Sequence, residues 1–518
     1  MSNPQNPSKR KHASLQELHD IKSPETKNTD CLIDIRSPLH YPQPIILNDQ
    51  QNYAMDCIAQ QGFSVFITGA AGTGKSEFVR HLIARLESSG DIVAVTSSKG
   101  FSAVQLGGRT IHAFSGLGKV NEEVDVIRKK AKTRYMQDIW NGVDVVIIDD
   151  ISMLDPEVFR KILMVSQLSR NVKKQHIQWV LVGDFFQQPP VGKRKFKDGD
   201  TVDNNAEFCF EIPEWSKIIH KGIVFTQVYR QTDPILIDIL NDVRRGAQDR
   251  MRYFSILNSR LDVQLPQDGI EPTILMVKPE LVNAENDQAL RRIKSPEHKY
   301  FSQKGYLVGK KIVPYHVPSS NKRLKTEALE IIRNLSVSEQ KKHRMLQFLE
   351  KNCPAEPILT LKKGAQVILL AELDLAHKLT CGSRGVVLGF TEAAPHYPVV
   401  KFAECSLTVR SYMWNLNITN ETKIWYSQIP LRLGWAYPIH RLEGQTMDRV
   451  SINLKDIFEY GQAYTALSRV RSLDVLKLTH LNFSCIKAHP NVIEYYDGLE
   501  KTSEKEFNLW LKKKKSVV

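Results

Sequence analysis

The sequence predicts an α/β fold built on parallel sheets. Four apolar runs, each long enough for one buried strand, end in polar or glycine-rich turns at residues 65–67, 92–96, 143–148 and 177–182. The first run leads directly into a glycine loop and then into a helical pattern over 77–83. Units of this kind place their functional residues at the carboxyl ends of parallel strands.

The glycine loop reads G-A-A-G-T-G-K-S and matches the complete phosphate-loop pattern G-x-x-x-x-G-K-[ST]. Its glycines let backbone N–H groups and the following helix N-terminus converge on phosphate oxygens. We expect Lys75 to reach the β- and γ-phosphates and the Ser76 hydroxyl to ligate Mg²⁺. The predicted cofactors are therefore ATP and Mg²⁺, with loop contacts from Gly69, Ala70, Ala71, Gly72, Thr73, Gly74, Lys75 and Ser76.

The composition is that of a globular chain with a basic surface. The 518 residues are 42% hydrophobic and carry a formal net charge of +14. This charge favours a polyanionic partner, with nucleic acid ahead of an anionic membrane surface. The seven cysteines include no C-x-x-C pair, which argues against zinc and iron–sulfur sites and for reduced thiols. No apolar run reaches membrane-spanning length, so we expect a soluble intracellular protein.

Both ends of the chain are polar and charged. Residues 1–40 are rich in Pro, Ser and Asn and are expected to form a disordered tail. Lys9-Arg10-Lys11 is a candidate nuclear import signal, although short basic runs are usually only solvated. Residues 501–518 are expected to form a basic C-terminal tail. Its run from Lys512 to Lys515 is a candidate for phosphate contacts, and the favoured alternative is a frayed, solvated end.

Further candidates for the nucleotide site lie outside the glycine loop. Gln51, upstream of the loop, is a candidate for reading the adenine edge. Asp149, at the end of a strand, is positioned for Mg²⁺, and Asp150 beside it is positioned to polarise the attacking water. Gln187 follows the next strand as a candidate γ-phosphate sensor, and Arg230 is a candidate arginine finger that reaches the γ-phosphate from a neighbouring lobe.

The turn after the strand at 92–96 and the segment that follows it carry side chains suited to a single-stranded nucleic-acid track. Hydroxyls, a lysine, a histidine and an aromatic ring combine backbone contacts with base stacking. The candidates are Thr96, Ser97, Lys99, His112 and Phe114. The alternative is that Phe114 is a core ring and His112 a turn residue.

In this order the motifs resemble those of the Pif-type DNA helicases, in the Pif/RecD branch of superfamily one. In the first half the resemblance rests on Gln51, the phosphate loop, T-S-S-K-G at 96–100, D-D-I-S-M at 149–153, G-D-F-F-Q at 183–187 and Y-R-Q at 229–231. In the second half, residues 428–448 resemble the family's fifth motif and 461–473 its sixth. The resemblance covers most of residues 47–480.

The resemblance implies two RecA-like P-loop NTPase domains with parallel sheets, and a small β-barrel insert in the second domain. Such domains close on ATP at their interface, grip single-stranded DNA across both, and step 5′→3′. The expected boundaries are 41–230 for the first domain, with a small wedge insert near 105–140; 231–290 and 425–500 for the second; and 291–424 for the insert. The implied partners are single-stranded DNA and forked or 5′-tailed duplex DNA, bound by a monomer.

The resemblance also adds site residues in the second half of the chain. Arg469 is expected to join Arg230 in stabilising charge in the transition state. Gln462 and Tyr464 are expected on the surface that closes on the nucleotide. His440 and Thr446, in the fifth motif, are expected to contact nucleic acid.

Departures from the family pattern indicate a divergent relative and leave a rival function open. Asp150 stands where the family usually has Glu, and Glu443 places a carboxylate near the expected DNA path. The rival is a nucleic-acid-binding protein with an impaired ATPase that uses nucleotide only to switch its grip. RNA as the track is a third alternative.

Overall fold

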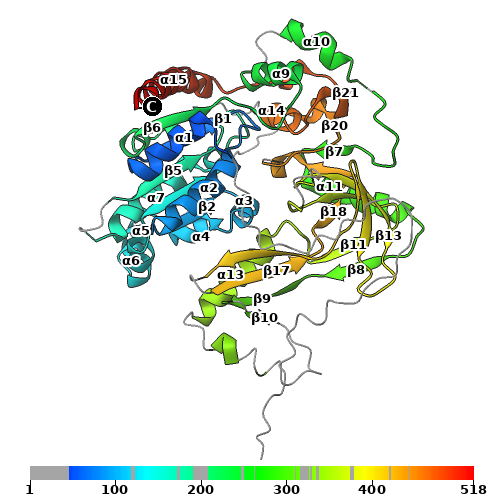
Figure 1. Cartoon of the computed structure of the whole chain (residues 1–518), viewed down its shortest axis with the longest axis horizontal. Coiled ribbons are helices and arrows are strands. Elements are labelled where there is room, and N and C mark those ends of the chain that lie inside the picture. The colour runs from blue at the N-terminus through cyan, green and yellow to red at the C-terminus, as the bar shows by residue number, and fades with distance from the viewer. Residues whose placement is uncertain are drawn as a thin grey trace, which may run out of the picture.

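The computed structural model contains two domains with parallel sheets and a region of antiparallel strands (Figure 1). It describes residues 46–117, 123–171, 176–190, 208–246, 250–261, 263–309, 311–315, 326, 330–333, 338–373, 379–418, 422–442 and 444–517. The tail expected at residues 1–40, with its basic cluster at 9–11, and Glu443 lie outside this described part. Among the described helices, none combines the length and the apolar character needed to cross a membrane.

The first domain is built on one six-stranded parallel sheet. Its strands, in spatial order, are β3 (Arg109–Thr110), β2 (Val93–Ser97), β4 (Val145–Asp149), β5 (Gln178–Val182), β1 (Val65–Gly69) and β6 (Lys221–Phe225). Every residue of β1 and β4 is buried, as expected for strands covered on both faces. The four apolar runs predicted to be strands all lie in this sheet, so that prediction is confirmed.

Helices pack on both faces of this sheet. They are α1 (Asp49–Met55), α2 (Lys75–Ser88), α3 (Gly100–Gln105), α4 (Ile111–Ser115), α5 (Val124–Ala131), α6 (Arg134–Asn141), α7 (Pro156–Ser169) and α8 (Trp215–Ile218). Alternate residues of the central strands enter two different hydrophobic cores, one with α7 and one with α2. The predicted wedge segment supplies α5 and α6, which pack on α7 through buried residues such as Trp140.

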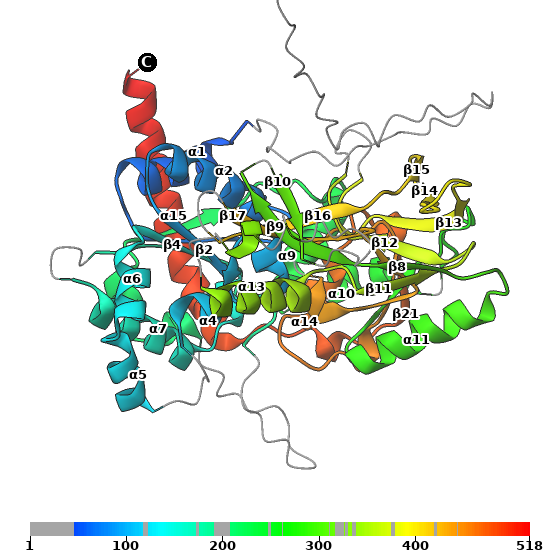
Figure 2. The ribbon, with the colours of Figure 1, turned by 90° about the horizontal axis from the view of Figure 1, so that it is seen from below.

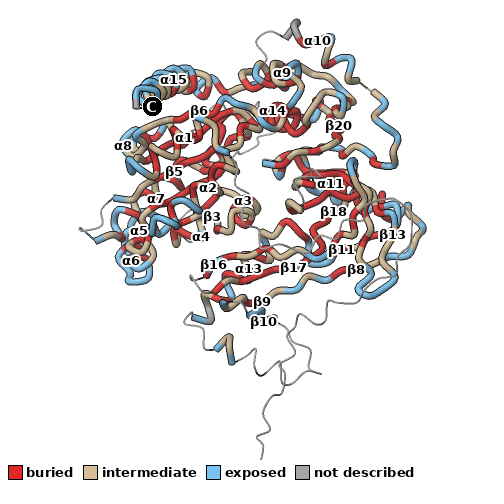
Figure 3. Tube along the Cα trace, viewed as in Figure 1, coloured by how far each residue is buried: buried red, intermediate tan, exposed pale blue. Residues whose placement is uncertain are grey.

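The second domain contains a smaller parallel sheet. Its strands, in spatial order, are β19 (Ala436–Pro438), β7 (Thr273–Met276), β20 (Val450–Asn453) and β21 (Leu476–His480). Its helices are α9 (Pro234–Arg244), α10 (Arg250–Asn258), α11 (Pro279–Arg292) and α14 (Gln462–Leu467). Residues from α9 and α14 share one core with β20 and β21. Figure 3 shows buried chain in both parallel sheets.

The insert consists of antiparallel strands and one long helix, α13 (Glu339–Asn352). A five-stranded sheet contains β15 (Ser406–Thr408), β14 (Pro398–Phe402), β13 (Arg384–Phe390), β12 (Gln366–Leu369) and β18 (Leu431–Leu433). A four-stranded sheet contains β10 (Lys311–Pro314), β9 (Gln303–Val308), β17 (Thr422–Gln428) and β16 (Tyr412–Asn417), and β11 (Ile358–Leu361) pairs with β8 (His298–Phe301). The expected closed barrel is not confirmed, because in the described residues these sheets remain separate ladders. Since β17 and β18 belong to them, the insert extends beyond residue 424.

The carboxyl-terminal segment is a helix, not a frayed tail. The helix α15 (Pro490–Val517) enters the core of the first domain with its first turns and then runs along that domain, beside β6 and α1 (Figures 1 and 2). Val492 and Tyr496 are fully buried, and the Ser503 hydroxyl accepts a hydrogen bond from Val224 N at 3.0 Å. The prediction was wrong because an apolar stripe at three- and four-residue spacing precedes the four lysines at 512–515, and this spacing is typical of a helix with one buried face.

The Trp510→Ala variant tests the attachment of α15 to the first domain. Trp510 lies against Tyr53 and Phe507, and its Nε1 donates to Asp56 Oδ2 at 3.0 Å. Loss of this partly buried ring should lower the free energy of unfolding by about 2–3 kcal/mol in a chemical denaturation experiment. The neighbouring exposed residue gives the control, because Leu509→Ala should change stability by less than about 0.5 kcal/mol. Equal effects of the two variants would contradict the packing.

Candidate functional site

The glycine loop forms a tight cradle between β1 and α2. Gly69, Gly72 and Gly74 have φ angles of 143°, 88° and 79°, a region that residues with side chains rarely adopt. A Cβ atom added to Gly72 would lie 2.6 Å from the Arg230 Cβ, so a side chain has no room there. Because α2 begins at Lys75, its N-terminal N–H groups point into the same cradle.

Lys75 lies folded over the loop. Its Nζ donates to the carbonyl oxygens of Gly69 at 2.7 Å and Ala70 at 3.0 Å. Burial lowers the pKa of Lys75 to about 8, and the largest opposing influence is the carboxylate of Asp184. The cradle, the ammonium group and the hard oxygen donors of Ser76 and Asp149 fit a nucleoside triphosphate with Mg²⁺.

Asp150 is held in a strained backbone conformation, with a φ of 54°. Its carboxylate accepts a hydrogen bond from the Ser102 hydroxyl at 2.6 Å, and its backbone N–H donates to Asp149 Oδ1 at 3.0 Å. The predicted pair therefore stands at the end of β4, but Asp150 is turned toward α3. Its predicted role on the attacking water remains a prediction.

Gln187 lies in a loop that contacts both domains. Its backbone N–H donates to Asp184 O at 2.9 Å, and its side-chain Nε2 is 3.5 Å from Asp184 Oδ2. On the other side, a Cβ atom on Gly461 of the second domain would clash with the Gln187 carbonyl oxygen. Gln187 is therefore packed where the first domain meets the second.

Arg230 belongs to the first domain and extends its side chain to the second, although it was expected to reach the nucleotide from the neighbouring lobe. Its backbone lies on the first-domain side, because its N–H donates to Gly72 O at 3.3 Å. Its guanidinium group extends to the second domain and donates to Thr446 Oγ1 at 3.0 Å, Ser468 O at 3.3 Å and Gly444 O at 3.2 Å. The expectation that Arg230 arrives from the neighbouring lobe is wrong, since the chain places it directly after β6. Thr446, expected to contact nucleic acid, is a partner of Arg230.

The second domain reaches the phosphate loop through Tyr464. The Tyr464 hydroxyl accepts a hydrogen bond from Ala71 N at 2.7 Å, and burial raises the pKa of Tyr464 to about 12. Arg469, almost fully buried, donates to Thr465 O and Leu442 O at 2.7 Å each. Burial lowers the pKa of Arg230, and the nearby Arg469 lowers it further. Tyr464 therefore touches the loop directly, whereas the guanidinium groups of Arg230 and Arg469 bond to residues of the second domain, and their roles on the nucleotide remain a prediction.

Gln51 lies beside the phosphate loop as predicted. Its Oε1 accepts from Asn48 N at 3.1 Å, and its Nε2 is 3.1 Å from the position of a Cβ atom on Gly74. Next to it, Tyr229 is 48% exposed and its hydroxyl accepts from Asn48 Nδ2 at 2.7 Å. Tyr229 offers a flat ring beside the Gln51 amide, a suitable partner for a nucleotide base. This role of Tyr229 was not predicted from the sequence.

A cavity of about 620 Å³ lies between the first domain, the insert and the second domain. Lys99 and His440 line it from opposite domains, and Lys99 Nζ donates to His440 O at 3.3 Å. Burial lowers the pKa of His440 to about 4, so its ring is neutral near pH 7. Gln462, predicted at the nucleotide, lines this interdomain cavity, and its Oε1 accepts from Phe458 N at 3.3 Å.

Three predicted nucleic-acid contacts are wrong because their side chains are buried. The Thr96 hydroxyl donates to Ile147 O at 2.6 Å inside the sheet, and the fully buried Ser97 Oγ accepts from Lys99 N at 3.2 Å. Phe114 packs edge-to-face on Trp140, so the alternative of a core ring is confirmed. His112 lies half-buried on α4.

Several residues of the interdomain cavity were missed by the sequence analysis. They include Phe101, Lys351, Arg432, Arg441 and Phe458. Phe101 directly follows the segment 96–100, and its aromatic ring next to Lys99 is the local signal for this residue. The others come from distant parts of the chain, and only the fold brings them together.

A phosphate cradle that is shared between two parallel-sheet domains defines a two-domain P-loop nucleotide-binding protein. A family model described as PIF1-like helicase matches residues 46–246. The chain is 30% identical over 491 residues to the ATP-dependent DNA helicase PIF1 of Xenopus laevis, covering 93% of this chain and 69% of that protein. It is 31% identical over 503 residues to RRM3 of Saccharomyces cerevisiae, covering 88% and 68%. The chain belongs to the PIF1-like helicase family.

Solved structures agree with this assignment. The Pif1 helicase of Candida albicans matches with a TM-score of 0.60 and 30% identity, covering 88% of this chain and 100% of that one. Bacteroides Pif1 in complex with ADP-AlF4 matches with a TM-score of 0.67 and 23% identity, covering 89% and 98%. The chain spans about two thirds of the curated relatives, 69% of the Xenopus protein and 64% of the human one.

The pKa of Lys75 leads to a pH-dependent affinity for ATP. Because the pKa is about 8, the ammonium group loses its proton as the pH rises from 7 to 9, and the neutral amine attracts phosphate less. The dissociation constant for ATP, measured by calorimetry, should rise by about tenfold over this interval. Lys75→Arg keeps its charge and should show no such rise. A constant affinity of the unchanged protein from pH 7 to 9 would contradict the assignment.

Lys99→Ala tests the interdomain cavity as a nucleic-acid site. Loss of one phosphate contact should weaken binding to single-stranded DNA and reduce the slope of log K against log salt by about 0.7–1. The measurement is fluorescence anisotropy across a salt series. Lys505→Ala, an exposed lysine on α15, removes the same charge away from the cavity and should leave the slope unchanged. Identical slopes for both variants would exclude Lys99 from the site.

Proposed function

We propose that this protein is an ATP-dependent DNA helicase that moves 5′→3′ along single-stranded DNA and separates the strands of forked or 5′-tailed duplexes. Its cofactors are ATP and Mg²⁺, and it acts in replication, repair or recombination. The observation that carries the proposal is the shared phosphate site. Tyr464 bonds to Ala71 N across the domain interface, and Arg230 spans the same interface. A nucleotide in this cradle contacts both domains.

Hydrolysis is coupled to domain movement because neither domain holds a complete site. Lys75 would bind the phosphates, and the Ser76 hydroxyl and the Asp149 carboxylate would hold the Mg²⁺ ion, which would neutralise phosphate charge. Gln187 senses the γ-phosphate, while Arg230 and Arg469 stabilise the charge that develops during transfer. ATP supplies the phosphoryl group that water accepts, and the change of charge alters the contacts between the domains.

The hydrogen bond between Ser102 and Asp150 joins the nucleotide side to the cavity proposed for DNA. Ser102 lines that cavity, and its hydroxyl donates to the carboxylate proposed to orient the attacking water. DNA that contacts this wall therefore acts on a group of the hydrolytic site. This arrangement supports stimulation of ATP hydrolysis by DNA.

Solved relatives support DNA as the track. Bacteroides Pif1 has been solved bound to single-stranded DNA, with a TM-score of 0.54 to this chain. Another solved structure, also with a TM-score of 0.54, concerns the unwinding of forked double-stranded DNA by two coordinating Pif1 helicases. In this protein the cavity wall carries basic side chains that suit the phosphates of DNA. They are Lys99, Lys351, Arg432 and Arg441. The cradle, the arginines and the cavity come from one chain, which supports action as a monomer. The basic cluster at residues 9–11 supports a location in the nucleus.

Strand separation on tailed duplexes tests the proposal. ATP and Mg²⁺ should drive unwinding of a 5′-tailed duplex but not of a 3′-tailed one. Lys75→Ala removes the ammonium group from the phosphates and should lower both unwinding and ATP turnover by about a hundredfold or more. Lys505→Ala should retain both activities. Equal unwinding of the two substrates would overturn the polarity, and matched RNA duplexes test RNA as the track.

DNA-stimulated ATP turnover separates the helicase from its rival, a nucleotide-switched binding protein. Purified protein that binds single strands but shows no stimulated hydrolysis would support the rival. The carboxylate of Asp150 would then be too short, or too firmly held by Ser102, to act on water.

A further inference from the structure

A buried ion pair joins the second domain to the loop that carries Gln187. Arg244, the last residue of α9, donates to Asp184 through NH2 at 2.8 Å and through Nε at 3.2 Å. The side chain of Asp184 is 0% exposed and that of Arg244 is 7% exposed. Neither residue was singled out as a site residue from the sequence. The pair stands beside Lys75, whose pKa both residues influence.

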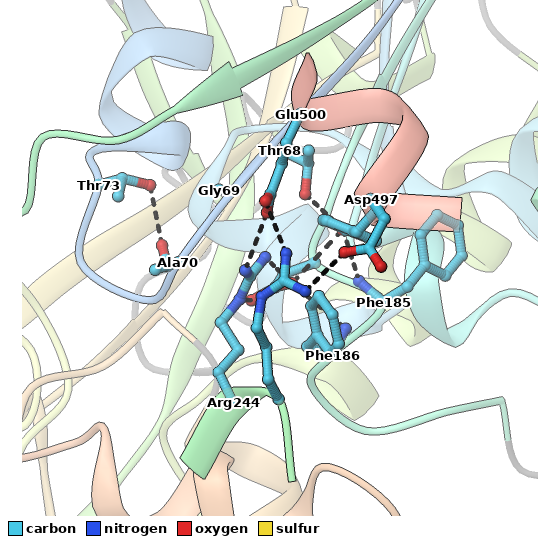
Figure 4. Close-up of polar contacts among 12 residues, drawn as sticks. Thr68, Gly69, Ala70, Thr73, Phe185, Phe186, Arg244, Asp497 and Glu500 are labelled. Carbon is cyan, nitrogen blue, oxygen red and sulfur yellow. Dashed lines mark hydrogen bonds and ion pairs between the residues drawn. The ribbon is translucent and has the colours of Figure 1, made fainter. Parts of the chain in front are cut away.

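The surroundings of Arg244 fix its guanidinium group in one orientation. The group lies over the ring of Phe186 at 4.4 Å and over the ring of Tyr496 at 5.0 Å. Figure 4 shows Arg244 extending from the end of α9 toward Phe186, with Glu500 of α15 on the opposite side. Planar stacking and two parallel hydrogen bonds leave a guanidinium group little freedom to turn.

Asp184 also contacts Gln187. The same carboxylate oxygen that accepts from Arg244 Nε is 3.5 Å from the Gln187 side-chain nitrogen, and the Asp184 carbonyl accepts from Gln187 N at 2.9 Å. A continuous series of polar contacts therefore runs from α9 through one carboxylate to the proposed sensor. Two elements of the second domain touch this loop, because Gly461 packs against the Gln187 carbonyl from another direction.

Stability alone is a weak reason for such a pair. Removing two charges from water costs several kcal/mol, and well-packed apolar residues often serve a fold equally well. A bidentate ion pair between two domains instead fixes the distance between the two side chains and the orientation of the carboxylate relative to the guanidinium group. When α9 moves with its domain, the Asp184 carboxylate must follow or the pair must break, and Gln187 is affected in either case.

We propose that Arg244 is a positioning residue for ATP hydrolysis, which holds Asp184 and, through it, sets the direction of the Gln187 amide according to the position of the second domain. The inference rests on the proposed function and specifies how domain position is communicated to the nucleotide. Arg244 itself touches no reacting atom in this account. Its effect passes through the carboxylate of Asp184.

Arg244→Lys tests this role, since it keeps the charge but loses the bidentate geometry. The DNA-stimulated kcat should fall by about tenfold, while KM for ATP stays within about twofold. Arg245→Lys is the matched control. Arg245 is adjacent in sequence and pairs with Asp497 at 2.8 Å and with Glu500 at 2.6 Å, whereas Asp184 is bonded by Arg244. This control should keep kcat and KM unchanged.

A double-mutant cycle with Gln187→Ala distinguishes positioning from a general structural effect. If Arg244 acts through Gln187, Arg244→Lys should lower kcat by less than about twofold further in the Gln187→Ala background. Losses that multiply independently would overturn the proposal. Should Arg244→Lys fail to fold, the double variant Arg244→Gln with Asp184→Asn leaves no buried charge unpaired. That variant must then show the kcat loss, and full activity in it would overturn the proposal.

The two proposals fail in different ways. Absence of DNA-stimulated turnover in the unchanged protein overturns the proposed helicase function. Normal turnover in the unchanged protein together with full kcat in Arg244→Lys overturns only the role of Arg244.

Discussion

The contact of the Tyr464 hydroxyl with the N–H of Ala71 is the interaction on which the rest of the site depends. Through it the second domain touches the phosphate cradle directly, at the loop that a bound nucleotide occupies. The same interface orders Arg230 against the 444–468 segment and packs Gly461 against the Gln187 loop. A change of a few tenths of an ångström in the cradle must alter these contacts, because close-packed interfaces rearrange rather than stretch.

Local sequence patterns were sufficient for the first domain and for its nucleotide cradle. The apolar runs became β1, β2, β4 and β5, and the glycine loop took its position because its residues alone require that backbone. In these cases the information lies within a few consecutive residues.

Features that depend on packing between distant segments could not be predicted in this way. Thr96 and Phe114 are of the right type for a nucleic-acid track, but neighbouring strands and Trp140 bury them. The pairing of Asp184 with Arg244 joins residues sixty positions apart, and neither residue has a distinctive local pattern. Arg230 belongs to the first domain and bonds to the second. This could not be predicted, because it depends on where the chain crosses from one sheet to the other.

The path of α15 has a mechanical consequence. The polypeptide leaves the first domain after β6 and returns to it through α15, so the two parallel-sheet bodies are tethered at two separate places. A body held at two points swings about the line through them far more readily than it slides or twists. A rotation about the line through these two crossings is therefore the relative motion of the two bodies that would strain the connecting chain least.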